Sequence, residues 1–187
     1  MKDKKHTGAI GAKARRLCLA AFLVALSFLL GWLAKALQGT SPLRFTVEGL
    51  PVLLGGLCLG GVYGALIGVT ADLLSCLLAG QAPLPLITVG AAMLGLIPGI
   101  LSHVLFRKQQ IYAAPPSYPC LLLVTAAAHT VGSILIKSYA LSQFYGFDTL
   151  LWRLPIYLGV ILLESYLLHL LLHSHPIRRE LERLIKP

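Results

Sequence analysis

The chain has 187 residues, of which 57% are hydrophobic and only 12% are charged, and its formal net charge is +9. A soluble domain carries about 25% charged residues, so this composition excludes a water-soluble single domain, and the apolar runs exclude a disordered or fibrous chain. The basic residues gather before Leu17 and after Ile177. They are typical of the flanks of a membrane protein and not of a basic nucleic-acid-binding face.

Apolar runs recur from Leu17 to Pro176. About 20 apolar residues suffice for a helix to cross the hydrocarbon core of a bilayer, so the sequence predicts an all-α integral membrane protein, a bundle of six transmembrane helices. The first run exceeds the core of a signal peptide, about 7 to 15 residues, and is expected to remain as a helix. The second helix is too short to span alone unless its ends are buried in protein. The predicted helices are 15–38, 47–58, 61–79, 87–106, 118–142 and 150–174.

The basic residues also predict the topology, because Lys and Arg favour cytoplasmic segments. Six crossings place both termini on the same side of the membrane. Arg107 and Lys108, between the fourth and fifth predicted helices, fall on that side too. The outer connections are then short. The expected organisation is a basic cytoplasmic tail at 1–14, a six-helix membrane domain at 15–175 and a second basic cytoplasmic tail at 176–187. The amphipathic pattern after Pro176 is interpreted as an interfacial turn.

Three ionisable residues fall well inside predicted helices: Asp72, His129 and Glu164. Such residues are costly within a bilayer and commonly mark functional sites. A helix rises about 1.5 Å per residue, so each lies about 14 to 17 Å from the cytoplasmic end of its helix. They are expected to form a polar layer near the middle of the membrane.

A second layer of charge is expected nearer the outer surface. The same rise places Lys137 and Arg153 about 28 to 32 Å from the cytoplasmic side, level with Arg44 and Glu48. A cavity with Arg44, Lys137 and Arg153 at its mouth and the polar layer on its floor would bind an anionic small molecule, because a guanidinium matches a carboxylate bidentately. The alternative is that the arginines snorkel to lipid headgroups while the polar layer pairs internally.

Small residues recur every four positions on three of the predicted helices, where they allow close approach of helix backbones. Gly60, Gly64 and Gly68 precede Asp72 by successive turns, and Ala91, Gly95 and Gly99 follow the same spacing. We interpret these two stripes as internal packing. Ala21 and Ala25 on the first helix could instead face a partner protein.

Catalytic patterns are missing from the sequence. It has no phosphate-binding GxxxxGK[ST] loop, no HExxH and no CxxC pair. His169 and His173 share a helical face, but no acidic or thiol ligand accompanies them, so a solvated helix end is favoured over a metal site. We therefore expect no catalytic residues, no metal and no enzyme activity. An intramembrane enzyme using Asp72, His129 and Glu164 and a helix-binding scaffold remain the competing hypotheses.

Four segments, in this order, carry a resemblance to a known family. LRFTVEGLPVLLGG is similar to an Arg-Phe-x-Phe-x-Pro segment through Arg44 and Pro51, and LGGVYGALIGVTADLL keeps a glycine spacing that ends in Asp72, with Gly61 where that family has proline. PLITVGAAMLGLIPGI and WRLPIYLGVILLE are similar to its fourth and sixth helices. Together they resemble the substrate-binding S components of energy-coupling factor (ECF) vitamin transporters, most closely the folate-specific branch.

The resemblance implies a capture subunit of a prokaryotic cell membrane, working with a transmembrane coupling protein and two ATPase subunits that use the ATP. Ala21 and Ala25 would face the coupling protein, and Arg44 and Arg153 would hold the carboxylates of folate. The pterin ring would meet residues of the polar layer and its neighbours, namely Asp72, His129, Thr130, Ser133 and Glu164.

One departure bears on the substrate. The folate branch tends to carry Asn-Thr where this chain has His129 and Thr130. Pantothenate is therefore the second candidate, and biotin and riboflavin remain open. The cationic outer layer disfavours thiamine, which is itself a cation.

Overall fold

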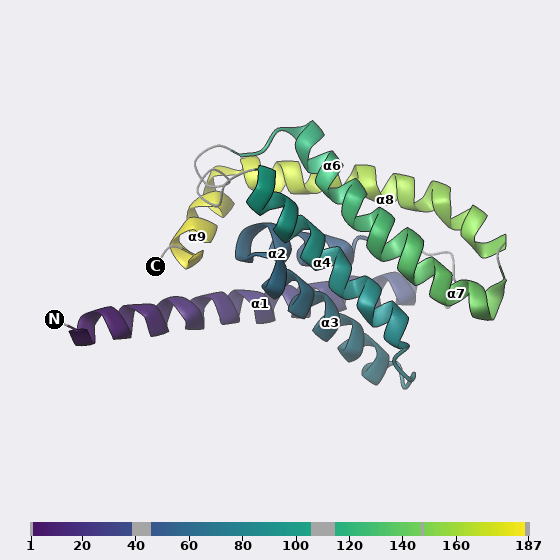
Figure 1. Cartoon of the computed structure of the whole chain (residues 1–187), viewed down its shortest axis with the longest axis horizontal. Coiled ribbons are helices and arrows are strands. Elements are labelled where there is room, and N and C mark those ends of the chain that lie inside the picture. The colour runs from purple at the N-terminus through teal and green to yellow at the C-terminus, as the bar shows by residue number, and fades with distance from the viewer. Residues whose placement is uncertain (1, 39–45, 106–114, 147, 186–187) are drawn as a thin grey trace.

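The computed structural model describes residues 2–38, 46–105, 115–146 and 148–185. Every regular element in these ranges is a helix, as the composition predicts (Figure 1). The elements are α1 (Lys2–Gln38), α2 (Gly49–Leu59), α3 (Gly61–Leu78), α4 (Pro85–Leu105), α6 (Tyr118–His129), the π-helix η1 (Thr130–Lys137), α7 (Ser138–Tyr145), α8 (Asp148–His173) and α9 (His175–Ile185).

Within these ranges, five helical stretches are long and apolar enough to cross a membrane. α2 has 11 residues, so at about 1.5 Å per residue it covers about half of the hydrocarbon core. Most of its residues are buried against other helices, as expected for a short element inside a bundle. The five stretches are Lys13–Ala34, Gly61–Leu78, Pro85–Leu105, Tyr118–Phe144 and Arg153–His173.

Both ends of the chain are more helical than the apolar runs predict. α1 begins at Lys2 and not at residue 15, because its basic start is rich in Ala, Lys and Arg, which favour helix. The predicted interfacial turn after Pro176 is wrong, since His175–Ile185 forms α9. α9 packs on α1, α2 and α8 and buries Leu181. A polar segment with one apolar face becomes a helix when a neighbouring surface covers that face.

The glycine stripes of α3 and α4 pack against each other. A Cβ built on Gly64 would meet the carbonyl oxygen of Gly95, and one built on Gly95 would meet the carbonyl oxygen of Gly64. A Cβ on Gly56 of α2 would also meet the Gly95 carbonyl. Only residues without a side chain allow this backbone contact, which confirms that these stripes serve internal packing.

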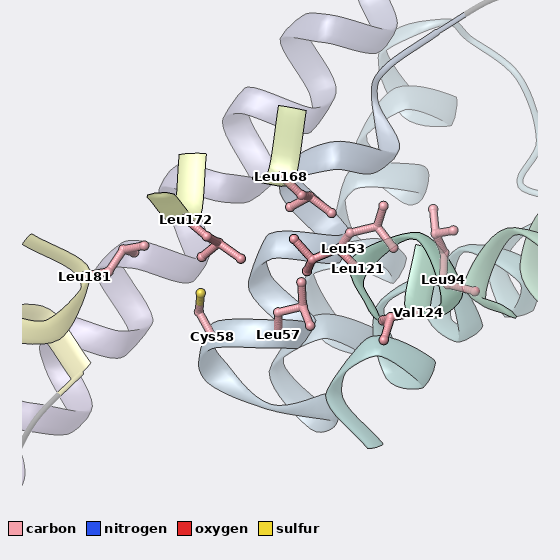
Figure 2. Close-up of a cluster of buried hydrophobic side chains, with 10 residues drawn as sticks. Leu53, Leu57, Cys58, Leu94, Leu121, Val124, Leu168, Leu172 and Leu181 are labelled. Atoms are coloured by element: carbon pink, nitrogen blue, oxygen red, sulfur yellow. The ribbon is translucent and has the colours of Figure 1, made fainter. Parts of the chain in front are cut away.

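A hydrophobic core joins the second half of the bundle to α2 and α4. Figure 2 shows its side chains converging from five helices, with Leu181 of α9 at one edge. This apolar packing fixes α8 against α2 and α6, and so sets the position of every polar residue that α8 carries. The labelled residues are Leu53, Leu57, Cys58, Leu94, Leu121, Val124, Leu168, Leu172 and Leu181.

The predicted helix at 118–142 runs on as α6, η1 and α7 and contains a π-helical segment, Thr130–Lys137. Here Ser138 Oγ donates to the carbonyl oxygen of Ser133 at 3.0 Å, and Gly132 approaches Gly90 of α4 so closely that a Cβ would lie 2.7 Å from its carbonyl oxygen. π-Helical turns change the direction in which later side chains point, and they often occur at functional sites.

The two termini lie at the same end of the bundle, where α1 and α9 are in contact (Figure 1). The reversals between α3 and α4 and between α7 and α8 lie at the other end. Gly80 (φ 63°) and Gly146 (φ 81°) occur at these reversals in the left-handed conformation that glycine adopts without strain.

Candidate functional site

A cavity of about 860 Å³ lies at the end of the bundle opposite the termini. One wall consists of the second half of α1, the start of α2, the end of α3 and the start of α4, and the other consists of η1, α7 and the start of α8. Small-molecule sites occupy about 300 to 1,000 Å³ and combine apolar walls with a few polar groups. The cavity has this size and this mixture of side chains.

The cationic wall carries Lys137 from η1 and Arg153 from α8. The side chain of Arg153 is 8% exposed, and its Nη2 donates to the hydroxyl of Tyr157, one turn later on the same helix. Its Nη1 is buried and has no hydrogen-bond partner among the described residues. A buried guanidinium nitrogen without a partner is costly, so the guanidinium of Arg153 is suited to bind a further acceptor.

The acidic wall carries Glu48, just before α2, and Asp72 from α3. Asp72 Oδ2 accepts a hydrogen bond of 2.7 Å from Thr88 Oγ1 on α4. Glu48 is held through its backbone, whose carbonyl oxygen accepts from Ser27 Oγ of α1 at 2.7 Å. Its carboxylate lies over Gly31, where a Cβ would collide with Oε2. Both carboxylates are therefore positioned by contacts with neighbouring helices.

His129 and Glu164 form a buried pair that does not line the cavity. His129 Nε2 lies 2.6 Å from Glu164 Oε2, and the exposed fractions of the two residues are 3% and 0%. The predicted polar layer on the cavity floor is thus corrected, because only Asp72 of the three lines the cavity. Glu164 follows Arg153 by 11 residues, so it lies about 16 Å further along α8. Its carboxylate is buried there and needs a polar partner, which His129 of α6 supplies.

The remaining predicted ligand residues also fall outside the cavity lining. Thr130, the first residue of η1, is exposed on the surface of the bundle, because its neighbour His129 faces the interior. Ser133 is buried, and its Oγ lies 3.2 Å from His129 Nδ1. Arg44 lies outside the described residues.

Ala21 and Ala25 are both exposed on α1, whereas Ala20 and Leu23 are buried against the bundle. The pair therefore lies on the face of α1 that points away from the other helices. A small-residue face of this kind is available to another helix.

Two histidines lie one turn apart at the end of α8. The rings of His169 and His173 are 3.9 Å apart between centroids, and no group of three His, Cys, Asp or Glu side chains in the described ranges could hold a metal ion. Tyr118 packs edge-on against His169, so the histidines belong to a packed helix end.

The family model of the ECF transporter substrate-specific component matches residues 15–174, which is most of the chain and includes both walls of the cavity. The chain belongs to this family. A comparison with curated proteins finds no match. The protein is thus a multi-pass membrane protein and the substrate-binding subunit of a transporter, which favours ligand capture over catalysis in the cavity.

Two cavity residues of this S component escaped the sequence prediction of the site. Tyr157 holds Arg153, and its position four residues further along a helix was the available signal. Glu48 stood in the predicted outer layer, but its placement in the cavity depends on the contact between Ser27 and the start of α2. Hydropathy carries no information on such a contact.

Proposed function

We propose that this S component captures an anionic vitamin, with folate preferred, in the cavity between the acidic and cationic walls. The observation that carries the proposal is the guanidinium of Arg153, which belongs to a residue that lines the cavity and whose buried Nη1 has no hydrogen-bond partner among the described residues. A carboxylate of the ligand would accept hydrogen bonds from the guanidinium of Arg153. It would also be attracted by the positive charge of Lys137, which lines the same cavity. Charge-assisted hydrogen bonds of this kind are shorter and stronger than neutral ones.

The proposed orientation follows from the basic residues at both termini. Under the positive-inside rule these residues face the cytoplasm, and the cavity lies at the opposite end of the bundle, facing outside. We propose a prokaryotic cell membrane as the location. Capture from outside then matches the position of the cavity.

Transport requires partners, because the sequence has no phosphate-binding loop with which to use ATP. We propose that a transmembrane coupling protein and two ATPase subunits supply the energy, and that Ala21 and Ala25 contact the coupling protein. Both alanines are exposed on α1, whereas Ser27 and Gly31, through which the same helix lines the cavity, are buried. Ligand capture and partner binding would then use different surfaces.

The experiment that tests the proposal is thermal unfolding of the detergent-purified chain with folic acid, pantothenate, biotin, riboflavin and thiamine. A ligand that binds only the folded state raises stability by RT ln(1 + [L]/Kd). We expect folic acid to raise the Tm most. A shift with pantothenate alone would reassign the substrate, and no shift with any vitamin would contradict the proposal.

A pair of variants separates the cavity from general electrostatics. Arg153→Ala should weaken vitamin binding by about 1.5 to 3 kcal/mol, the range for hydrogen bonds to charged groups. The matched control is Arg179→Ala, since Arg179 is exposed on α9 at the other end of the bundle. Equal affinity of the wild type and Arg153→Ala would exclude Arg153 as the carboxylate partner.

A further inference from the structure

Among the described residues that line the cavity of this S component are two acidic and two basic side chains, and none of the four forms an ion pair with another. Glu48, Asp72, Lys137 and Arg153 all line it. In the described part of the chain, the contacts within 4.0 Å between a basic and an acidic side chain join His129 to Glu164 and Glu180 to Arg183, and neither contact includes a cavity residue. The four charges are therefore kept apart inside one cavity.

The charges are also sorted by wall. Glu48 and Asp72 come from the segment before α2 and from α3, whereas Lys137 and Arg153 come from η1 and α8. One residue of each sign is held by a hydrogen bond within its own wall. Thr88 donates to Asp72, and the hydroxyl of Tyr157 accepts from Arg153. Opposite charges in a poorly solvated space attract strongly, so an arrangement that prevents their pairing leaves both signs available to a ligand.

We propose that the ligand is bipolar, with an anionic group bound by Arg153 and Lys137 and a group rich in hydrogen-bond donors, or positively charged, bound by Asp72 and Glu48. The inference rests on the proposed function, because it takes this cavity as the substrate site. Glu48 and Asp72 then determine specificity, and apolar residues that also line the cavity, Val52, Leu94 and Ile156, cover the body of the ligand. The anionic ligand expected from the sequence is then one that also carries hydrogen-bond donors or a positive charge.

Ligands that carry only negative or only positive charge are expected to bind less tightly. A molecule carrying only carboxylates would satisfy Arg153 but offer Asp72 and Glu48 no donor or positive charge, and a molecule carrying only positive charge would offer the guanidinium of Arg153 no acceptor. Each unpaired buried charge disfavours binding. Specificity of this kind works by penalising the wrong ligand as much as by stabilising the right one.

Binding of three probes to the full-length protein in detergent tests the proposal. Folic acid carries carboxylates and an amino-pterin ring with several donors, N-benzoylglutamate keeps the carboxylates alone, and pterin keeps the donor ring alone. The variants are Asp72→Asn, Glu48→Gln and Arg153→Ala. Asp148→Asn is the matched control, because Asp148 is an exposed acid at the start of α8 that does not line the cavity.

We expect Asp72→Asn and Glu48→Gln to weaken folic acid binding by roughly tenfold or more each, as for a hydrogen bond to a charged group. Neither variant should weaken N-benzoylglutamate binding, because that ligand lacks the donor ring that the two acids would bind. Arg153→Ala should weaken both carboxylate ligands and spare pterin, and Asp148→Asn should change none of the three. Folic acid binding that is weakened by Arg153→Ala but not by either acid variant would overturn the proposal. So would wild-type binding of N-benzoylglutamate as tight as that of folic acid.

The Tm of the unliganded protein gives a second readout. If the acids serve the ligand, removing their charge should leave this Tm unchanged or raise it, as for other residues kept for function. A fall of several degrees in Asp72→Asn and Glu48→Gln, with no fall in Asp148→Asn, would overturn the inference, because the acids would then balance Arg153 and Lys137 in the empty protein. Failure of the proposed function gives a different result, namely no Tm increase of the wild type with any vitamin.

Discussion

The imidazole of His129 and the carboxylate of Glu164 meet at 2.6 Å although the two residues lie 35 positions apart in the chain. The pair joins α6 to α8 inside the bundle. The ring of Tyr157 lies next to it, 6.0 Å from the ring of His129 between centroids, and the hydroxyl of Tyr157 accepts from Arg153. Tyr157, which also lines the cavity, thus contacts both Arg153 and a member of the buried pair.

Removing one partner of this pair should strongly destabilise the protein. Glu164→Ala or His129→Ala leaves an unpaired polar group in an apolar interior, and such losses cost about 3 to 5 kcal/mol. Thermal unfolding in detergent measures the loss. The double variant Glu164→Leu with His129→Phe should lose less than either single variant, since neither member of the pair is left behind without the other.

The control for this prediction is Glu180→Ala, which breaks an exposed pair with Arg183 that has a similar N···O distance, 2.8 Å. Exposed pairs contribute little, so its Tm should match that of the wild type. Equal Tm values for Glu164→Ala and Glu180→Ala would contradict a stabilising role for the buried pair.

Gly95→Ala should destabilise the contact between α3 and α4. Its Cβ would meet the carbonyl oxygen of Gly64, a backbone atom that cannot move aside as a side chain does. Overpacking of this kind costs about 1 to 3 kcal/mol, measurable as a lower Tm. Gly11→Ala is the control, because a Cβ there meets nothing within 4 Å and alanine favours helix; a Gly95→Ala protein as stable as Gly11→Ala would contradict the packing argument.

Tyr157→Phe should weaken binding of the anionic vitamin without unfolding the protein. The variant keeps the ring beside His129 but removes the hydroxyl that holds Arg153. The loss of one such hydrogen bond corresponds to about a two- to tenfold rise in Kd, which isothermal titration calorimetry can measure. Tyr166→Phe, on an exposed tyrosine of the same helix, should bind normally, and the same Kd in both variants would rule out Tyr157 as a positioning residue.

Ala21→Trp and Ala25→Trp should prevent co-purification with the coupling protein and leave vitamin binding intact. Both positions are exposed on α1, where a bulky ring separates helices that small residues bring together. The matched control is Leu123→Trp, at an exposed position on α6. Normal co-purification of both alanine variants would place the partner surface elsewhere.

Three residues of the candidate site could be predicted from the sequence, because each is an ionisable residue in an apolar context. Asp72, Lys137 and Arg153 are ionisable residues inside or beside long apolar runs, and all three line the cavity. The same criterion selected His129 and Glu164, which instead pair with each other. The cost of a charge in lipid shows that such a residue requires a polar neighbour, but it does not identify the neighbour.

The sequence by itself determined the membrane class, the long helices and the internal packing of the glycine stripes. The length of an apolar run decides whether a helix can span a bilayer, and the spacing of small residues decides whether two helices can approach closely. The helical start of α1 depended on the helix propensity of its residues, and α9 depended on a neighbouring surface that covers its apolar face. The length of an apolar run predicts neither. Only the tertiary structure decided which polar residues reach the cavity. The π-helical segment places Lys137 at the cavity and leaves Thr130 exposed, and helix packing brings Glu48 and Arg153 to the same cavity. The direction of a side chain depends on the rotation of its helix against neighbours far away in the chain, and no local pattern specifies that rotation.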